Sequence, residues 1–368
     1  MRIFVEKSFF SGELKLFQGV FEKKTLIDIL QNIKVTAFEN GDLELVATDL
    51  EIGLSSKIKV NVDEPGTFTV NGRDFYDLIS KMPEGNIEIS ENNDLNISIS
   101  NEKKTSKYKL MGLQSTDYPQ LPEADFSNPI SLEIEKLGFL INKSYFIISP
   151  EMKFNLGGAL LTISDDIIEM ASTDGHRLSY SYFDYKDNKS DTVNFIISRK
   201  SLLELLKIGD GGSVDFSYDK NNLFFRYQNR ILSSRIIDQK FPNYKTVIPE
   251  NTEKEVIIES SELNSTLKRI LIFKSRNNGV VFKFEKGKLT LERTTPEKGE
   301  AHDEINIEYD GDPLSVAFNG NFIIDFLSHV NSEKIKIKMN DAESSFIFEP
   351  VTPSKEGKFI YVVMPLNI

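Results

Sequence analysis

The strongest constraint on the fold is a repeat with a period of about 120 to 125 residues. Thr173-Asp174 follows Thr48-Asp49 after 125 residues, and each pair lies between two runs of alternating apolar residues. A stretch that reads as a strand followed by a helix recurs at 194–206 and, less closely, at 315–327. Since one period is as long as a whole domain, the repeat predicts three copies of one domain and not a solenoid of short units.

Each copy is expected to hold two short helices and about eight strands, from the spacing of its apolar residues. Helices are predicted near residues 7–20, 72–81, 132–148, 199–207, 260–276 and 320–330. Helices packed on one face of antiparallel sheets make an α+β fold. Proline-containing segments end the first two copies, which places the domains at 1–122, 128–249 and 254–368.

Composition excludes several classes of protein. Hydrophobic residues make up 39% and charged residues 27% of the chain, which is typical of a soluble globular protein. No apolar run approaches the ~18 residues that a membrane span needs, and the N-terminus lacks the features of a signal peptide. The chain has no cysteine, which rules out disulfides, thiolate metal sites and cysteine nucleophiles. These features predict a cytoplasmic protein.

The net charge of −12 argues against nucleic acid as a partner unless the charge is unevenly distributed. The predicted helices carry about 13 Lys and Arg against about 8 Asp and Glu, which leaves the rest of the chain with a net charge of about −17. Basic residues cluster at Arg199-Lys200 and at Lys268, Arg269, Lys274 and Arg276. Each helix taken singly reads as a solvated surface. Taken together, the helices predict a basic face that holds phosphates without reading bases.

The segment 169–181 combines a hairpin signal with polar residues. Asp174-Gly175 is a turn between two alternating runs, because glycine adopts positive φ without steric cost. One interpretation of Asp174 with the following His176 is an acid/base pair, or part of a metal-dependent hydrolase site. The chain has no accompanying nucleophile motif, and His302 and His329 lie in unrelated stretches, so the sequence does not favour catalysis.

A β-rich carbohydrate-binding or adhesin module is a third class that the repeat would allow. Such a module would be secreted and would use tryptophan to stack on sugars, but the features of a signal peptide are missing and the chain has no tryptophan.

Four motifs lie in register with the repeat: Thr173-Asp-Gly-His-Arg-Leu178, Phe241-Pro-Asn-Tyr244, Phe318-Asn-Gly-Asn-Phe322 and Tyr361-Val-Val-Met-Pro365. They closely resemble the bacterial sliding clamp family, the beta subunits of DNA polymerase III, and the similarity covers the whole chain. The resemblance implies three clamp domains per chain and a head-to-tail homodimer that closes into a ring around duplex DNA. It also implies that the helices line the hole, and that the protein has no catalytic residue, cofactor or metal site.

The resemblance further implies roles for individual residues. A cleft between the second and third domains is expected to bind extended peptides of the polymerase alpha subunit, the clamp loader delta subunit, other polymerases and repair proteins. The residues expected to form this cleft are Leu156, Thr173, Gly175, His176, Arg177, Leu178, Pro242, Val247, Val362, Val363, Met364, Pro365 and Leu366. DNA contacts are expected from Lys23, Lys24, Arg73, Phe154, Arg199 and Lys200. The dimer interface is expected to bring Tyr108 and Leu110 of one chain against Leu271 and Ile272 of the other.

The chain departs from the family pattern at the rim of the expected cleft. Thr246 stands where relatives often carry a basic residue, Asn155 replaces an aromatic residue, and Asn367 replaces an arginine. The segment 25–30 also lacks the usual proline. These changes leave the fold expectation intact and the peptide preference open, and the change at Asn155 predicts a weaker stacking contact to single-stranded DNA.

Overall fold

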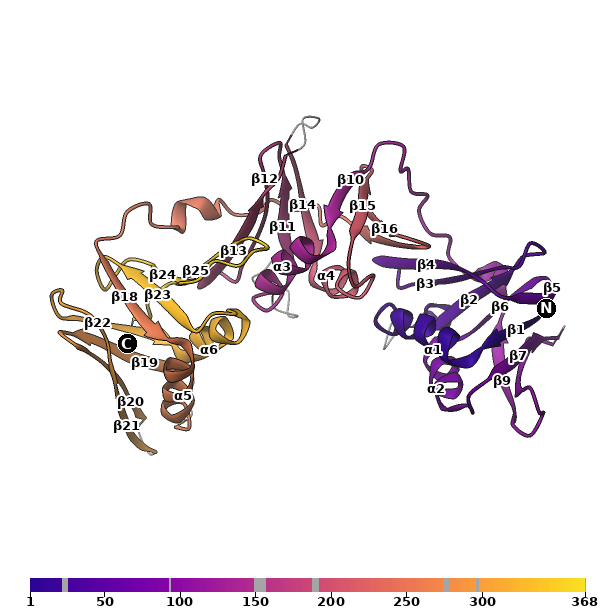
Figure 1. Ribbon diagram of the computed structural model, residues 1–368, viewed down its shortest axis with the longest axis horizontal. Coiled ribbons are helices and arrows are strands. Elements are labelled where there is room, and N and C mark those ends of the chain that lie inside the picture. Colours follow the sequence, from indigo (N-terminus) through magenta and orange to yellow (C-terminus); the bar gives the residue numbers. More distant parts are fainter. Residues whose placement is uncertain are drawn as a thin grey trace. The chain divides into compact units, whose positions relative to one another are not determined.

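The computed structural model describes residues 1–21, 26–92, 94–148, 157–186, 192–273, 278–295 and 298–367 (Figure 1). The chain forms two compact units. The first comprises Met1–Ile134 and Lys200–Ile236, and the second comprises Glu135–Arg199 and Ile237–Ile368. Among the described residues, no helix is long and apolar enough to cross a membrane.

The first unit is built on one antiparallel sheet of thirteen strands, in the order β10-β15-β16-β17-β4-β3-β2-β6-β9-β8-β7-β1-β5. The strands are β1 (Arg2–Glu6), β2 (Asn32–Ala37), β3 (Asp42–Thr48), β4 (Ile52–Lys59), β5 (Asn61–Glu64), β6 (Gly66–Asn71), β7 (Asn86–Glu91), β8 (Asn96–Asn101), β9 (Lys107–Leu113), β10 (Ile130–Glu133), β15 (Ser213–Tyr218), β16 (Asn222–Tyr227) and β17 (Arg230–Arg235). The helices are α1 (Lys7–Leu16), α2 (Gly72–Lys81), which packs on α1, and most of α4 (Arg199–Leu205). Short 3-10 turns are η1 (Phe17–Gly19), η2 (Asp28–Gln31) and η3 (Ser115–Asp117).

Alternation along these strands becomes alternation in burial. In β3, Leu43, Leu45 and Ala47 are buried, while the residues between them are partly exposed. The neighbouring strand β4 pairs with β3 on one side and with β17 on the other, where Leu232 lies opposite Leu54. The sheet therefore continues from the first expected domain into strands of the second.

The second unit holds an eight-stranded sheet, β14-β11-β12-β13-β25-β24-β23-β18, and a four-stranded sheet, β21-β20-β19-β22. The strands are β11 (Gly158–Ile163), β12 (Ile167–Thr173), β13 (Arg177–Asp184), β14 (Val193–Ser198), β18 (Lys254–Glu259), β19 (Gly279–Glu285), β20 (Lys288–Thr295), β21 (Gly299–Asn306), β22 (Leu314–Asn319), β23 (Lys334–Met339), β24 (Phe346–Pro350) and β25 (Lys358–Val363). The helices are α3 (Ile134–Ser144), α5 (Ser260–Ile270) and α6 (Gly320–His329), which packs on α5. A 3-10 turn, η4 (Tyr244–Val247), precedes β18.

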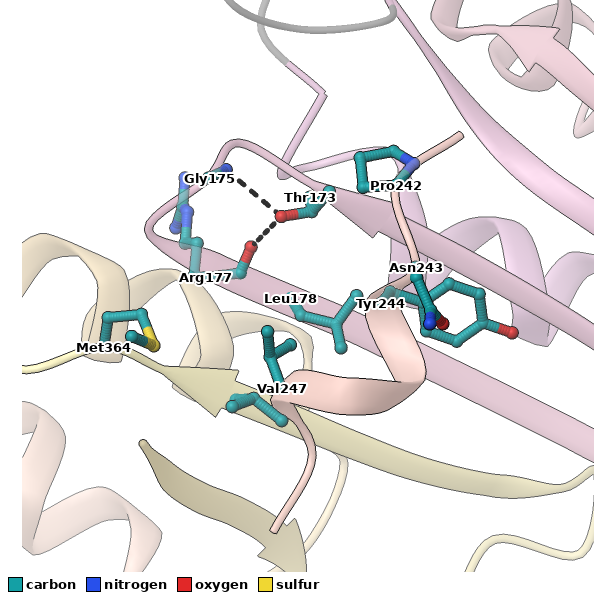
Figure 2. A pocket seen from close by; sticks show the side chains of 10 residues that line it. Thr173, Gly175, Arg177, Leu178, Pro242, Asn243, Tyr244, Val247 and Met364 are labelled. Carbon is teal, nitrogen blue, oxygen red and sulfur yellow. Dashed lines mark hydrogen bonds between the residues drawn. The ribbon is translucent and has the colours of Figure 1, made fainter. Parts of the chain in front are cut away.

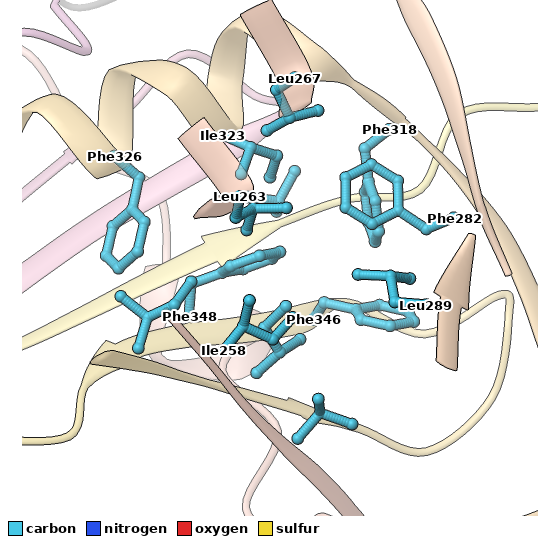
Figure 3. Packing of buried hydrophobic residues seen from close by; sticks show 14 of the residues in the cluster. Ile258, Leu263, Leu267, Phe282, Leu289, Phe318, Ile323, Phe326, Phe346 and Phe348 are labelled. Atoms are coloured by element: carbon cyan, nitrogen blue, oxygen red, sulfur yellow. The ribbon is translucent and has the colours of Figure 1, made fainter. Parts of the chain in front are cut away.

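Phenylalanine rings fill the core beneath α5 and α6 (Figure 3). Phe318 meets Phe346 edge to face with ring centroids 4.9 Å apart, and it meets Phe282 in the same way at 5.2 Å. Leu263 of α5 and Ile323 of α6 are fully buried against this cluster. Edge-to-face pairs favour one relative orientation of the rings, so the core fixes how both helices lie on the sheets.

Asparagine begins two of the helices. The Asn71 side chain accepts hydrogen bonds from the backbone N–H groups of Arg73 and Asp74, each at 3.1 Å, and Asn319 caps α6 by accepting one from Asn321 at 3.1 Å. The glycine after Asn71 permits close packing, because a Cβ on Gly72 would lie 2.0 Å from the Phe21 ring. An asparagine cap satisfies backbone N–H groups at the first turn of a helix, so Asn-Gly marks the same strand-to-helix junction in two copies.

The six predicted helices are confirmed near their expected positions, and with them the α+β class. Helix α5 ends at Ile270, before the expected end at 276, and Lys274 and Arg276 of the predicted basic cluster lie outside the described residues. The two compact units divide the second expected domain, because β17 pairs with β4 and β13 pairs with β25. The domain boundaries at 1–122, 128–249 and 254–368 therefore stay a prediction.

A buried carboxylate joins α1 to the sheet of the first unit. The two oxygens of Glu13 accept hydrogen bonds from Arg230, at 3.0 Å from Nε and 2.8 Å from Nη2, and Ser56 Oγ also donates to Glu13. Removing one partner of such a pair leaves the other charge in the interior without compensation.

We expect Glu13→Ala to lower the free energy of unfolding of the first unit by about 3 kcal/mol, the scale of a broken buried ion pair. Urea unfolding followed by circular dichroism measures this loss. The matched control is Asp63→Ala, which removes an exposed ion pair with Arg2 and should cost less than about 1 kcal/mol. Equal losses for the two variants would show that Glu13 does not tie the helix to the sheet.

Candidate functional site

The hairpin turn between β12 and β13 is locked by its own side chains. Thr173 Oγ1 donates a hydrogen bond to the Arg177 carbonyl at 2.8 Å and accepts one from the Gly175 N–H at 3.1 Å (Figure 2). Asp174 Oδ1 accepts from the N–H groups of His176 and Arg177, each at 3.1 Å. Gly175 has φ of +83°, a conformation that glycine adopts without the Cβ penalty of other residues. The predicted Asp-Gly turn is thereby confirmed.

The first copy contains the same turn. Thr48 Oγ1 donates to the Ile52 carbonyl at 2.8 Å, and Asp49 Oδ1 accepts from the N–H groups of Glu51 and Ile52 at 2.9 and 2.7 Å. Leu50 takes the place of Gly175 with φ of +75°, which costs a leucine about 1 kcal/mol. The two Thr-Asp pairs that reveal the repeat in sequence therefore build identical hydrogen-bonded turns.

The residues that follow each turn differ between the two copies. Leu178 of the second copy corresponds to Gly53 of the first, where a Cβ would lie 2.4 Å from the Leu121 side chain. Leu121 therefore covers the sheet at the point where Leu178 projects in the second copy. Asp49 forms its ion pair with Lys200, whereas Asp174 forms one with Arg177.

Arg177 links the turn to two other elements of the second unit. Its side chain is buried, and its nitrogens donate to Asp174 Oδ2 at 2.8 Å, Asp325 Oδ2 at 2.7 Å and the Tyr361 hydroxyl at 3.1 Å. The guanidinium carbon also lies 4.2 Å from the centre of the Phe322 ring. Burial opposes the charge of Arg177, but Tyr361 and the two carboxylates outweigh it and raise the pKa of Arg177. Arg177 is thus a permanently charged tie between β13, α6 and β25.

Glu169 performs a similar role on the other side of the turn. This buried carboxylate accepts hydrogen bonds from the Tyr180 hydroxyl at 2.6 Å and the Tyr244 hydroxyl at 3.0 Å, and it forms an ion pair with Lys245 at 3.0 Å. Through these contacts Glu169 holds the turn η4 against β12 and β13. The Tyr244 ring then packs with Leu178 and Val362 in one apolar cluster.

These contacts shape a cleft of about 240 Å³ on the second unit (Figure 2). Leu178 lies opposite Val362 in the pairing of β13 with β25, and both are buried beneath the opening. Val247 and Met364 are each 42% exposed. The lining residues are Thr173, Gly175, Arg177, Leu178, Pro242, Asn243, Tyr244, Val247, Val362 and Met364. An apolar concavity with a few polar groups at its rim is the general form of a ligand site.

Eight of the thirteen residues expected at the cleft line it. Of the others, His176 is exposed on the turn, where its carbonyl accepts a hydrogen bond from Met364 at 2.9 Å. Val363 belongs to the core below α6, because successive strand residues point to opposite faces. Pro365 and Leu366 are half-buried beyond the lining, with the Leu366 N–H donating to the Ala317 carbonyl at 2.7 Å, and Leu156 lies outside the described residues.

Asn243 and Tyr244 line the cleft without having been among the expected residues. Both belong to the Phe-Pro-Asn-Tyr motif, so the motif was the available signal. The departure Thr246 is exposed on η4, its hydroxyl donating to the Asn243 carbonyl at 2.8 Å, and Asn367 is exposed near the chain end. Asn155 lies outside the described residues.

Of the six residues expected to contact DNA, three belong to the described part of the chain. Arg73 lies half-buried in the first turn of α2. Arg199 donates to the Tyr145 carbonyl at 3.2 Å, and Lys200 donates to Asp49 and, at 3.2 Å, to the Val20 carbonyl. Lys23, Lys24 and Phe154 lie outside the described residues.

The residues expected at the dimer interface include two exposed side chains. Tyr108 is 47% exposed on β9, and Ile272 is 72% exposed after α5. Leu110 is half-buried, and Leu271 packs partly against the core of its own unit.

The geometry of Asp174 and His176 bears on the catalytic alternative. Both oxygens of Asp174 are occupied by backbone N–H groups and by Arg177, and the His176 ring lies near Phe322 with 6.4 Å between ring centres. Within the described part of the chain, no group of three or more His, Cys, Asp or Glu residues is placed to hold a metal ion. The carboxylate of Asp174 therefore serves the turn, and His176 has no base partner in it.

Comparison with known proteins shows matches along almost the whole chain. Three family models match: DNA polymerase III beta subunit N-terminal domain at residues 1–122, central domain at 131–243 and C-terminal domain at 245–367. The beta sliding clamps of Pseudomonas putida and Pseudomonas aeruginosa are 26% and 27% identical over the full length of both chains.

Solved structures agree with these matches. The DNA polymerase III subunit beta of Pseudomonas aeruginosa superposes with a TM-score of 0.91 at 25% identity, and both chains are covered completely. A sliding clamp of Bartonella birtlesii bound to griselimycin superposes with a TM-score of 0.93 at 27% identity, again over both whole chains.

We expect Tyr180, Tyr244 and Tyr361 to ionise at higher pH than exposed tyrosines. Burial raises the pKa of all three hydroxyls, and Glu169 raises it further at Tyr180 and Tyr244. A tyrosine with a raised pKa stabilises the fold below the unfolded value of about 10, and this contribution is lost as the pH rises above that value. Tyrosinate absorbance against pH measures the delayed step. Glu169→Gln should move part of that step to lower pH, and an unchanged curve would contradict the assigned contacts.

Proposed function

This chain belongs to the DNA polymerase III beta subunit family, and from that premise we propose that it is a sliding clamp. It encircles duplex DNA without sequence specificity and tethers the replicative polymerase and other proteins to it. The gain is effective concentration, because a polymerase that releases DNA is recaptured before it diffuses away. We assign the chain no catalytic activity of its own, and we place it in the cytoplasm.

The observation that carries this proposal is the cleft beneath Val247 and Met364. Exposed apolar side chains gathered over a buried apolar floor favour an extended peptide with apolar side chains. The Met364 thioether is adaptable in shape, which suits one site that serves several partners. We propose that the polymerase alpha subunit, the clamp loader delta subunit and repair proteins present such peptides here. A relative of this chain carries griselimycin, which supplies a probe for the cleft.

We propose that ring closure uses two incompletely paired strands. Within the described residues, the first half of β9 pairs only with β8, and β21 is an edge of the four-stranded sheet. Strand β9 carries Lys107 and Lys109, whereas β21 carries Glu300, Asp303 and Glu304. An unpaired edge accepts a strand from another chain, and opposite charges favour this pairing over like pairing. A head-to-tail contact of this kind closes into a ring when its rotation permits.

The charge on the helices supports DNA as the enclosed partner. The six helices that the structure describes hold ten Lys and Arg against seven Asp and Glu. Two of these acids, Glu13 and Glu204, and two of the bases, Lys7 and Lys143, are buried, so the exposed helix residues keep the same basic excess. We propose that Arg73, Arg199 and Lys200 contact phosphates, with Lys200 exchanging Asp49 for a phosphate oxygen. Contacts of this kind position a protein on DNA and carry no sequence information.

We expect Ile272→Asp to convert the dimer into monomers, because a carboxylate placed in an apolar interface loses its hydration. Light scattering should then give the mass of one chain, 41.9 kDa, in place of twice that value. The variant should also be lost from circular plasmid as readily as from linear plasmid. The matched control is Ile257→Asp, a partly exposed isoleucine on β18, which should remain a dimer. A dimeric Ile272→Asp protein would move the interface elsewhere.

We expect Val247→Asp to weaken griselimycin binding at least about tenfold, because the charge removes apolar surface from the cleft wall and resists burial. Isothermal titration calorimetry measures the affinity. Val351→Asp makes the same change at an exposed position outside the lining and serves as the control. Unchanged binding by Val247→Asp, with the dimer intact, would remove the cleft from the proposed function.

A further inference from the structure

The sheet face that forms the floor of the cleft extends well beyond it. Leu178, Tyr180 and Tyr182 alternate along β13 and therefore share one face. Across the pairing with β25, they lie opposite Val362, Ile360 and Lys358 in turn. Four residues of strand separate Leu178 from Tyr182, a length of about 13 Å. An apolar strip thus leads out of the cleft and becomes aromatic and basic at its far end.

A second pocket of about 260 Å³ lies at that end of the strip. Its lining includes Tyr182 and Asp184 from β13, Lys358 from β25, and Lys355 and Glu356 from the loop before β25. Lys136 of α3 also lines it. Tyr182 belongs to both the strip and this pocket, and its ring lies 5.3 Å from that of Tyr180. The strip therefore joins the two pockets through Tyr180 and Ile360, which are partly buried beside Tyr244.

Two lysines of the second pocket are available to a ligand. Among the residues that the structure describes, neither Lys355 nor Lys358 has a carboxylate within ion-pair distance, and Lys358 Nζ lies 5.4 Å from the centre of the Tyr182 ring. Glu356 is held ionised, because hydrogen bonds from Ser354 and its own backbone, followed by Lys355, lower its pKa. Counting Lys136 and the two acids, the pocket has one positive charge in excess.

Strand β23, which β24 separates from β25 in the same sheet, shows a different arrangement. On β23, Lys334, Lys336 and Lys338 pair with Glu259, Glu255 and Glu349 at 3.3, 3.2 and 2.7 Å. Each of these three lysines of β23 is therefore matched with a carboxylate, whereas Lys358 of β25 contacts the Tyr182 ring. An acidic ligand group would complete the same pattern at Lys355 and Lys358.

We propose that a partner peptide continues from the cleft along the Tyr180–Tyr182 strip and places an acidic side chain over Lys355 and Lys358. This inference rests on the proposed function of the cleft and adds the chemical class of the flanking residues. The aromatic rings receive the peptide between its anchor and its acidic end. Exposed charge pairs contribute little singly, so the apolar anchor supplies most of the affinity and the acidic end supplies preference among partners.

The test uses two labelled peptides that share one half composed of leucine and phenylalanine. The other half is Asp-Glu-Asp in one peptide and Asn-Gln-Asn in the other, and each peptide is made in both orders. Fluorescence anisotropy should show the acidic peptide, in one order, binding the dimer about threefold to tenfold more tightly, with the difference shrinking as salt is raised. Lys358→Glu should abolish the preference and Lys358→Arg should retain it. Lys286→Glu, the same charge change on an exposed turn of this unit, should leave it unchanged.

Competition with griselimycin separates the two levels of the proposal. If both peptides bind equally and griselimycin displaces both, the acidic preference is wrong and the cleft stands. If griselimycin displaces neither peptide, the proposed use of the cleft is wrong and this inference falls with it. A preference that persists in Lys358→Glu overturns the assignment of the second pocket.

Discussion

Backbone pairing between β13 and β25 is the constraint on which the site depends. The two strands are distant in sequence, and their register places Leu178 beside Val362 to make the floor of the cleft. Arg177 secures one end of this pairing through Asp325 and Tyr361. A buried guanidinium is stable only while its partners remain in place, so hairpin, helix and strand behave as one piece. The exposed side chains of Val247 and Met364 lie outside these contacts.

The two Thr-Asp turns show how one local structure supports different surroundings. In both turns the threonine hydroxyl donates to a backbone carbonyl, and the aspartate oxygen accepts from backbone N–H groups. The second carboxylate oxygen forms an ion pair with Lys200 at Asp49 and with Arg177 at Asp174. The turn is formed by hydrogen bonds to the backbone, and the ion-pair partner of its aspartate depends on which basic residue the neighbouring elements place beside it. Repetition in sequence therefore predicted the turns and not their electrostatic partners.

Local features were the most predictable from sequence. The Asp-Gly turn and the helix positions follow from short stretches whose physics is nearly independent of the rest of the fold. The DNA, peptide and dimer residues came from the resemblance, and their roles stay proposals. The role of Glu169 could not be predicted from sequence, because its partners Tyr180 and Tyr244 reach it only in the folded structure. Val363 was expected at the cleft together with Val362, although alternation along a strand points the two side chains to opposite faces.

The division of the chain into two units could not be predicted from sequence, because it depends on the pairing of β4 with β17 and of β13 with β25.

The contact of Leu121 with Gly53 distinguishes the surroundings of the two turns. In the first copy, a leucine of the same chain fills the space beside the residue that corresponds to Leu178. The second turn instead borders the cleft, with Thr173, Gly175 and Leu178 in its lining. Two turns built from the same hydrogen bonds therefore differ in whether the space beside them is already filled from within the chain.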